Sequence, residues 1–169
     1  MYSQKRVDSV MVLQPIQVMS IAQEIAPELD PRLIAAIVQV ESMGDPDATR
    51  DEPHYRWVHR ESIDKEYIHQ RRSWGLMQIM GAVARELGHD DRLTDLRDPY
   101  TNIRLGAKYL RALINRWPRR DEANIPIDAI SAYNAGHPTW QEPGGNHEYV
   151  NKVLAALRDI TKNHVDGVT

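Results

Sequence analysis

An all-α fold, with room for a short β-ribbon within the segment 49–72, is the fold class that this 169-residue sequence predicts. Apolar residues recur every three or four positions over most of the chain, which is the period of a helix with one buried face. Two Asp-Pro pairs, Asp30-Pro31 and Asp98-Pro99, stand directly before such segments. Aspartate is a common helix cap and proline suits the first helical position, so both pairs predict helix starts.

The first half of the chain holds three predicted helices and one irregular segment. The helices cover residues 14–27, 31–42 and 76–87; Gly44 follows the second and Gly88 closes the third. Residues 45–74 mix Asp, Pro, His, Arg and Tyr without a helical period. We therefore expect a loop there, with one short helix and the β-ribbon.

The second half holds three more predicted helices. A long helix begins at Asp98-Pro99 and runs to about residue 117, where Pro118 ends it. Helices over 126–135 and 147–162 follow, separated by a loop at 136–146 that contains glycine and proline. No repeat or shift in composition marks a boundary, so residues 1–169 are expected to form a single domain.

The composition excludes several classes of function. The net charge of -3 does not favour nucleic-acid binding, and the absence of cysteine rules out disulfides and thiolate metal sites. The seven histidines show no metal-ligand spacing, so no metal or other cofactor is expected. Near the N-terminus, Asp8, Gln14, Pro15 and Gln17 interrupt the apolar stretch. We therefore expect neither an export signal nor a membrane-inserted segment.

One acidic residue lies on the apolar face of a predicted helix. In the helix 31–42, Glu41 continues the rows formed by Leu33 and Ile37 and by Ile34 and Val38. A carboxyl group among aliphatic side chains keeps its proton at higher pH, and such a group can serve as a general acid. Spacing alone leaves a plainer alternative open, in which a glutamate at a helix end pairs with an arginine.

Four short segments suggest the family. They are Glu41-Ser42-Met43-Gly44-Asp45-Pro46-Asp47-Ala48, Ser73-Trp74-Gly75-Leu76-Met77-Gln78-Ile79-Met80, Gly106-Ala107-Lys108-Tyr109-Leu110 and Ala129-Ile130-Ser131-Ala132-Tyr133-Asn134-Ala135-Gly136, with Glu148-Tyr149-Val150 downstream. In this order they resemble the soluble lytic transglycosylase (SLT) family, which has a goose-type lysozyme-like fold. The resemblance covers about residues 18–160.

The resemblance implies a catalytic residue and two groups of substrate-binding residues. Glu41 matches the catalytic acid and base of the family. Met77 and Gln78 match the segment that lines the sugar cleft. Tyr133 and Asn134 match the pair beside the catalytic glutamate and the glycan, where the tyrosine hydroxyl can reach the carboxyl. Core packing of Met77 and a purely structural Tyr133 remain alternatives.

Two further positions are implied by the same comparison. Ser73 matches a polar position ahead of the Gly-Leu-Met-Gln motif, suited to contact an N-acetyl group or the catalytic glutamate. Tyr149 matches an aromatic residue that supports the catalytic corner.

The first and second motifs stand farther apart here than is usual in the family. The additional residues include Tyr55, Arg56 and Trp57, which could stack on sugars or hold peptide stems. A structural loop anchored by Trp57 is the alternative. The same insertion contributes Glu52 and Glu61 as further acids.

By resemblance, the expected reaction is cleavage of the MurNAc-GlcNAc bond of peptidoglycan with formation of a 1,6-anhydro sugar. One carboxylate is enough for this reaction, whereas glycoside hydrolysis normally uses two. A goose-type muramidase is the main alternative, with a second acid supplied by Asp45, Asp47, Glu52 or Glu61. A glycan-binding or structural virion module without catalysis is the other alternative.

The resemblance also implies where the protein acts. Its expected partner is the peptidoglycan glycan strand, and it is expected to be a monomer or a domain of a larger assembly. Because no export signal is apparent, we interpret it as a phage or prophage enzyme that reaches the cell wall with the virion or at lysis. A domain of a longer chain, or a chain that has lost its signal, are the alternatives.

Overall fold

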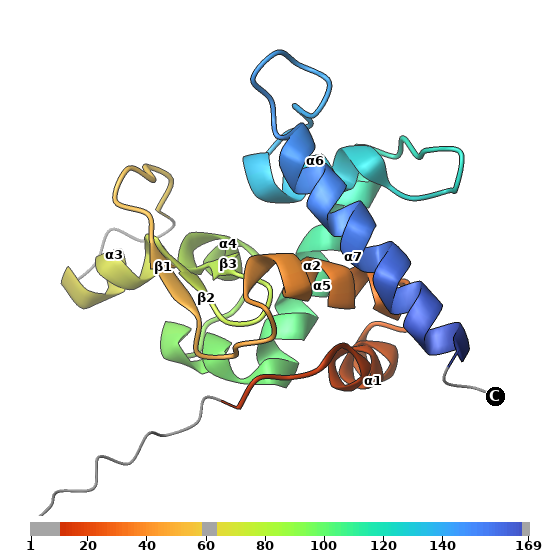
Figure 1. Ribbon diagram of the computed structural model, residues 1–169. Helices are drawn as coiled ribbons and strands as arrows, with labels where there is room; N and C mark the ends of the chain where they lie inside the picture. The colour runs from red at the N-terminus through yellow and green to blue at the C-terminus, as the bar shows by residue number, and fades with distance from the viewer. Residues whose placement is uncertain (1–10, 59–63, 167–169) are drawn as a thin grey trace, which may run out of the picture.

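The computed structural model describes residues 11–58 and 64–166, and within these ranges the chain is mainly helical (Figure 1). The helices are α1 (Pro15–Ile25), α2 (Pro31–Glu41), α3 (Asp64–Gln70), α4 (Gly81–Glu86), η1 (Leu93–Arg97, a 3-10 helix), α5 (Pro99–Arg116), α6 (Ile127–Ala135) and α7 (His147–Asp166). Strands β1 (Thr49–Asp51), β2 (Arg72–Trp74) and β3 (Ile79–Met80) form a small antiparallel sheet in that order. The predicted fold class is confirmed.

Both Asp-Pro pairs begin helices, as predicted. The Asp30 carboxylate accepts a hydrogen bond from the Arg32 amide at 2.9 Å. The Asp98 carboxylate accepts one from the Thr101 amide at 2.8 Å. These side chains satisfy amide groups that the first helical turn leaves without a backbone partner.

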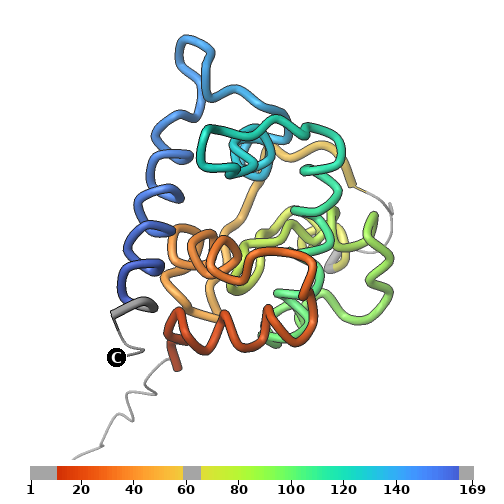
Figure 2. The backbone as a smooth tube through the Cα atoms, turned by 90° about the vertical axis from the view of Figure 1, so that its right-hand side faces the viewer, coloured from red at the N-terminus to blue at the C-terminus, as the bar shows by residue number. Residues whose placement is uncertain are grey.

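Helix α2 lies at the centre of the helical part of the molecule. It packs against α1 and α7, and Figures 1 and 2 show it next to both of these helices. All six residues from Leu33 to Val38 are buried. Burial of each large aliphatic side chain contributes roughly 1.5–3 kcal/mol, so α2 is held firmly. Its last residue, Glu41, is thereby held in place with its side chain partly buried.

The predicted helix over 76–87 is wrong in its first half. Residues 75–78 form a turn, β3 follows, and α4 begins only at Gly81. Gly75 and Gln78 have φ angles of +67° and +47°, which no right-handed helix contains. The apolar spacing of Leu76 and Ile79 reflects burial in a turn and a strand. Side-chain bonds from three distant helices, described below, override the helical pattern.

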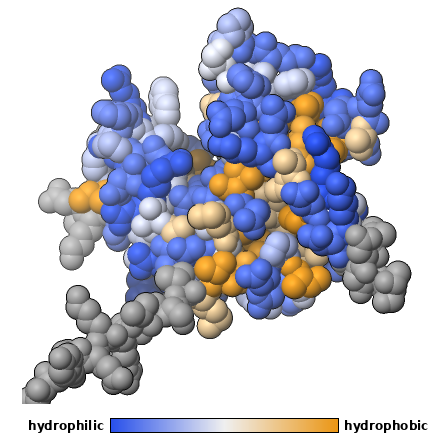
Figure 3. Space-filling model, in the orientation of Figure 1, coloured by the Kyte–Doolittle hydropathy of each residue, from blue (hydrophilic) through white to orange (hydrophobic). Residues whose placement is uncertain are grey.

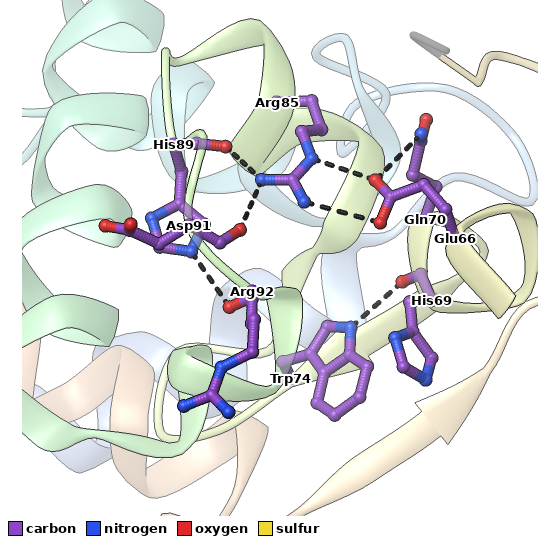
Figure 4. A network of polar contacts seen from close by, with 8 residues as sticks. All are labelled: Glu66, His69, Gln70, Trp74, Arg85, His89, Asp91 and Arg92. Atoms are coloured by element: carbon purple, nitrogen blue, oxygen red, sulfur yellow. Dashed lines mark hydrogen bonds and ion pairs between the residues drawn. The ribbon is translucent and has the colours of Figure 1, made fainter. Parts of the chain in front are cut away.

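The insertion between the first and second motifs is anchored by a buried arginine. Helix α3 presents Glu66, whose carboxylate lies 2.9 Å from Nε of Arg85 on α4. Arg85 also donates to the carbonyls of His89 and Asp91 (Figure 4). The Arg85 side chain is only 6% exposed, so these bonds satisfy a charge largely removed from water.

The β-ribbon expected within 49–72 occurs as β1 and the first residue of β2, and β3 adds a third strand outside that segment. The expected short helix is α3. Glu61, named above as a candidate second acid, lies outside the described residues. Within the described ranges, no helix has both the length and the apolar character needed to cross a bilayer.

Candidate functional site

Glu41 opens onto a cavity of about 440 Å³ between the sheet and helix α6. Figure 3 shows a hollow between the surface built on β1 and its following loop and the surface built on α6 and the start of α7. The residues that line the cavity include Glu41, Arg50, Glu52, Tyr55, Trp57, Ser73, Gln78, Met80, Tyr109, Tyr133 and Asn134. Five of the seven site residues expected from the sequence therefore line this one cavity. They are Glu41, Ser73, Gln78, Tyr133 and Asn134.

The Glu41 carboxyl has one protein partner among the described residues. The Tyr149 hydroxyl donates to its Oε1 at 2.7 Å. Burial raises the pKa of Glu41, while the Tyr149 hydrogen bond and the positive charge of Arg50 lower it to a smaller extent. Oε2 is left without a protein partner in the described part of the chain. The carboxyl can therefore carry a proton on Oε2, facing a ligand, while Oε1 stays hydrogen-bonded.

Of the two tyrosines near Glu41, Tyr149 donates to the carboxyl and Tyr133 does not. Tyr133 was expected to reach the carboxyl, but its hydroxyl donates to the Met77 carbonyl at 2.9 Å. Tyr149, from the first turn of α7, makes the contact instead. Burial raises the pKa of both hydroxyls well above 10.0, so each remains a donor at neutral pH. The register of α7 against α2, which the sequence does not show, decides this.

The turn at residues 75–78, part of the second motif, accepts hydrogen bonds from residues of the first and fourth motifs. Asn102 on α5, fully buried, donates to the carbonyls of Trp74 and Leu96 and accepts from the Met77 amide, at 2.7–2.8 Å. Ser42, next to the candidate acid, donates to the Leu76 carbonyl at 2.8 Å. Together with the Tyr133 bond, these contacts fix the turn from three helices.

Gly75 is required at the start of this turn. Its φ is positive, and a Cβ there would collide with the Leu96 carbonyl and the Asn102 amide group. Any side chain would therefore push the turn away from α5.

Met77 does not line the cavity, and the alternative of core packing is correct. Its side chain is fully buried. It lies directly against Gly106 of the third motif, where a Cβ would overlap its sulfur. Met77 contributes to the site through its backbone, because its carbonyl receives the Tyr133 hydroxyl.

Gln78 and Asn134 both line the cavity. The Gln78 amide donates to the carbonyls of Ala48 and Gly75, both at 3.0 Å, which holds the turn to the segment after α2. Asn134 is exposed at the end of α6, and its Oδ1 accepts from Asn146 at 3.2 Å. Both keep polar atoms for a ligand.

Ser73 is buried in the cavity wall and makes no hydrogen bond to Glu41 in the described structure. Its hydroxyl lies 3.3 Å from the Met80 sulfur, a weak contact that leaves it available to a ligand. Across the sheet, Ser73 pairs with Arg50 on β1 and with Met80 on β3. All three side chains line the cavity, so this row forms its floor on the sheet side.

The insertion contributes directly to the cavity. Tyr55 and Trp57 line it, and Trp57 is 75% exposed, which contradicts a role as the anchor of a structural loop. Aromatic rings presented in this way can stack on sugar rings. Arg56 is not among the lining residues.

Glu52 is the second carboxylate of the cavity among the described residues. It pairs with Arg50 at 2.5 Å. Asp45 and Asp47 do not line the cavity; the Asp47 carboxylate lies 3.7 Å from Arg97, on another side of the loop.

Three residues of the site were missed from the sequence. Arg50 and Tyr109 line the cavity, and Asn102 holds the turn. Tyr109 lies within the third motif, and its ring centroid is 5.3 Å from that of Tyr133 with the rings tilted by 54°, so the motif itself was a signal. An asparagine on the apolar face of a predicted helix was a signal for Asn102. Nothing in the sequence distinguished Arg50. Within the described ranges, no group of three potential metal ligands occurs.

Comparison with known proteins gives one family and several relatives. The family model of the transglycosylase SLT domain matches residues 18–153. A transglycosylase of Enterobacteria phage PRD1 is 36% identical over 141 residues, which cover 83% of this chain and 42% of the relative. Membrane-bound lytic murein transglycosylase F of Alcanivorax borkumensis is 31% identical, covering 79% of this chain and 25% of the relative. The corresponding protein of Shewanella loihica is 32% identical over 52% of this chain and 18% of its own length. The chain spans less than half the length of each of these curated relatives.

Proposed function

This chain belongs to the transglycosylase SLT domain family, and on that basis we propose that it is a peptidoglycan lytic transglycosylase with Glu41 as its general acid and base. The observation that carries the proposal is the position of Glu41. Its carboxyl is mostly buried, its pKa is raised by that burial, and it opens onto a cavity with aromatic and amide side chains suited to sugars.

The proposed reaction uses one carboxyl group twice. Glu41 donates its proton to the oxygen that links MurNAc to GlcNAc, and the electron pair of the C1–O bond leaves with that oxygen. The N-acetyl group of the muramyl sugar stabilises the positive charge at C1. The muramyl 6-hydroxyl oxygen then bonds to C1, and its proton returns to Glu41. The enzyme is restored, a 1,6-anhydro end is formed, and no water is consumed.

Tyr149 stabilises the ionised state of Glu41 in this scheme. When the proton leaves Oε2, the Tyr149 hydroxyl becomes a charge-assisted donor to Oε1, and such bonds are stronger than neutral ones. Gln78, Asn134 and Ser73 are proposed to contact the sugar hydroxyl and N-acetyl groups. Their location in the cavity wall supports these roles.

Replacing Tyr149 with phenylalanine is expected to lower the maximal cleavage rate about tenfold, the loss of one hydrogen bond to a charged group. The same hydrogen bond lowers the pKa of Glu41, so its removal raises that pKa further. Glu41 must be protonated to start the reaction, so the alkaline limb of the rate profile moves to higher pH. Rates measured between pH 4 and pH 9 test this.

Tyr100→Phe is the matched control, because Tyr100 is 48% exposed on α5 and does not line the cavity. It should leave both the rate and the profile unchanged. An unaltered pH profile in the Tyr149 variant would show that the hydrogen bond does not act on the reacting group.

Hydrolysis by a muramidase is the second candidate, and Glu52 is the observation that favours it. A second carboxylate in the same cavity could activate a water molecule. Its ion pair with Arg50 occupies one of its two oxygens. Transglycosylation needs no such group, and the names of the relatives are those of transglycosylases.

Mass analysis of digested peptidoglycan separates the two candidates. We expect muropeptides that end in 1,6-anhydroMurNAc, each lighter by one water than the hydrolysis product. Products with reducing ends alone would support the muramidase. No products from the wild-type protein, with strands still bound, would support a glycan-binding or structural module.

The relative from phage PRD1 supports delivery to the cell wall as part of a phage particle or release at lysis. The proposed partner is the glycan strand of peptidoglycan, approached as a monomer or as a domain of a larger assembly.

A further inference from the structure

Arg50 is the only lysine, arginine or histidine that lines the cavity in the described part of the chain. It stands in the middle of β1, opposite Ser73, with its side chain on the cavity face of the sheet. Its neighbour Asp51 points to the other face, where its carboxylate lies 2.6 Å from Arg72. The alternation of the strand thus places the Arg50–Glu52 ion pair on the cavity face and the Asp51–Arg72 ion pair on the other face.

Among the described residues, the guanidinium of Arg50 donates only one hydrogen bond. Glu52 accepts from its Nε at 2.5 Å, and no other hydrogen bond to Arg50 occurs among the described residues. The side chain is 63% exposed, against 33% for Glu52. No described residue therefore occupies the two terminal nitrogens. Planar guanidinium groups bind carboxylates through two parallel hydrogen bonds, which Nε alone cannot provide.

Arg50 also lies within electrostatic range of Glu41, whose pKa its charge lowers. A muramyl sugar whose C1 is placed at Glu41 carries its lactyl substituent on the same ring, at C3. That substituent bears a carboxylate, either its own in strands without peptide or those of the attached stem. The Arg50 guanidinium in the cavity wall is suited to bind such a carboxylate.

We propose that Arg50 binds a carboxylate of the muramyl substituent, and that Glu52 holds the guanidinium in the substrate's absence. This inference rests on the proposed function, because it names a substrate feature that the same cavity recognises. Arg50 is then a specificity-determining residue, which favours muramyl strands over neutral glycans. Glu52 is a positioning residue that competes with the substrate for the same guanidinium.

The test measures binding in the full chain carrying Glu41→Gln, so that the strands stay intact. One ligand is glycan strand freed of peptide by an amidase, which exposes lactyl carboxylates. The second is uncrosslinked strand with its stems, and the third is peptide-free strand whose lactyl groups have been converted to neutral methylamides. Calorimetry at a fixed, low salt concentration gives the dissociation constants.

Arg50→Gln is expected to weaken binding of at least one anionic strand roughly 10- to 100-fold, the range for a charged hydrogen-bonded pair. Binding of the neutral strand should change less than about twofold. Glu52→Gln should act in the opposite direction and tighten anionic strands, because it releases the guanidinium. Arg104→Gln, an exposed arginine of α5 outside the cavity, is the control for loss of one charge.

The ligands identify the source of the carboxylate. An effect on peptide-free strands assigns it to the lactyl group, and an effect confined to strands with stems assigns it to the peptide. The proposal is overturned if Arg50→Gln weakens neutral and anionic strands equally, or if Glu52→Gln also weakens anionic strands. Failure of the proposed function is distinct, since the protein with Glu41 intact would then form no anhydro ends from any strand.

Discussion

Replacing Glu41 with glutamine is expected to reduce formation of anhydro ends about 10²- to 10⁴-fold, the range for loss of a positioned acid and base. Glutamine keeps the size of the side chain and an oxygen that can accept the Tyr149 hydrogen bond. It has no proton to donate to the glycosidic oxygen. Chromatography of soluble muropeptides released from purified cell walls measures the effect.

The same substitution should not weaken the fold at neutral pH. Burial raises the pKa of Glu41 in the folded state, so its stabilising contribution is complete only below the pKa of the unfolded chain. That contribution is lost as the pH rises through the folded pKa. Glutamine cannot ionise, so the variant avoids the cost of a buried negative charge. The free energy of unfolding of Glu41→Gln minus that of the wild type should therefore increase from pH 4 to pH 7.

Glu24→Gln is the matched control for both measurements, because Glu24 is exposed on α1 and far from the cavity lining. It should change neither activity nor the pH dependence of stability. Undiminished cleavage by the Glu41 variant, with a normal melting curve, would falsify the role assigned to this residue.

Replacing Asn102 with alanine is expected to lower the free energy of unfolding by about 3–5 kcal/mol. The side chain makes three hydrogen bonds to backbone groups of the turn and its surroundings. Its removal leaves the Met77 amide and the carbonyls of Trp74 and Leu96 buried without hydrogen-bond partners. Each such group costs roughly 1–3 kcal/mol before the structure relaxes. Urea unfolding, followed by tryptophan fluorescence, measures the change.

Asn115→Ala, an exposed position on the same helix, controls for helix propensity and should change stability by no more than about 0.5 kcal/mol. Anhydro-end formation by Asn102→Ala should fall even at temperatures where the protein is folded, because the turn carries Gln78 and the carbonyl that receives Tyr133. A loss of stability below about 1 kcal/mol would mean that water replaces the amide.

The sequence predicted the parts of the fold that depend on neighbouring residues. Helix starts at Asp30-Pro31 and Asp98-Pro99 are local, because cap and proline act on the adjacent turn. The place of Glu41 on a buried face follows from the helical period alone. The irregular segment after α2 was likewise apparent from the absence of any period.

The site as a working arrangement was only partly predictable. The ordered motifs singled out Gln78 and Asn134, which line the same cavity as Glu41, and Tyr149, which donates a hydrogen bond to the Glu41 carboxyl. The same motifs gave Met77 a place in the cleft that it does not have. A motif records which residues occur together, and it does not separate side chains that face a ligand from those that pack against Gly106.

By itself, then, the sequence determined the helices outside residues 76–80, the place of Glu41 on a buried face and the family, since these depend on local spacing and on residue order. Only the tertiary structure decided that the residues after Gly75 form a turn and a strand, because Asn102 on α5, Tyr133 on α6 and Ser42 at the end of α2 hold that backbone. It also decided that Tyr149, 108 residues from Glu41, donates to the carboxyl. Contacts between residues far apart in the chain depend on how helices pack, and no period in the sequence encodes that packing.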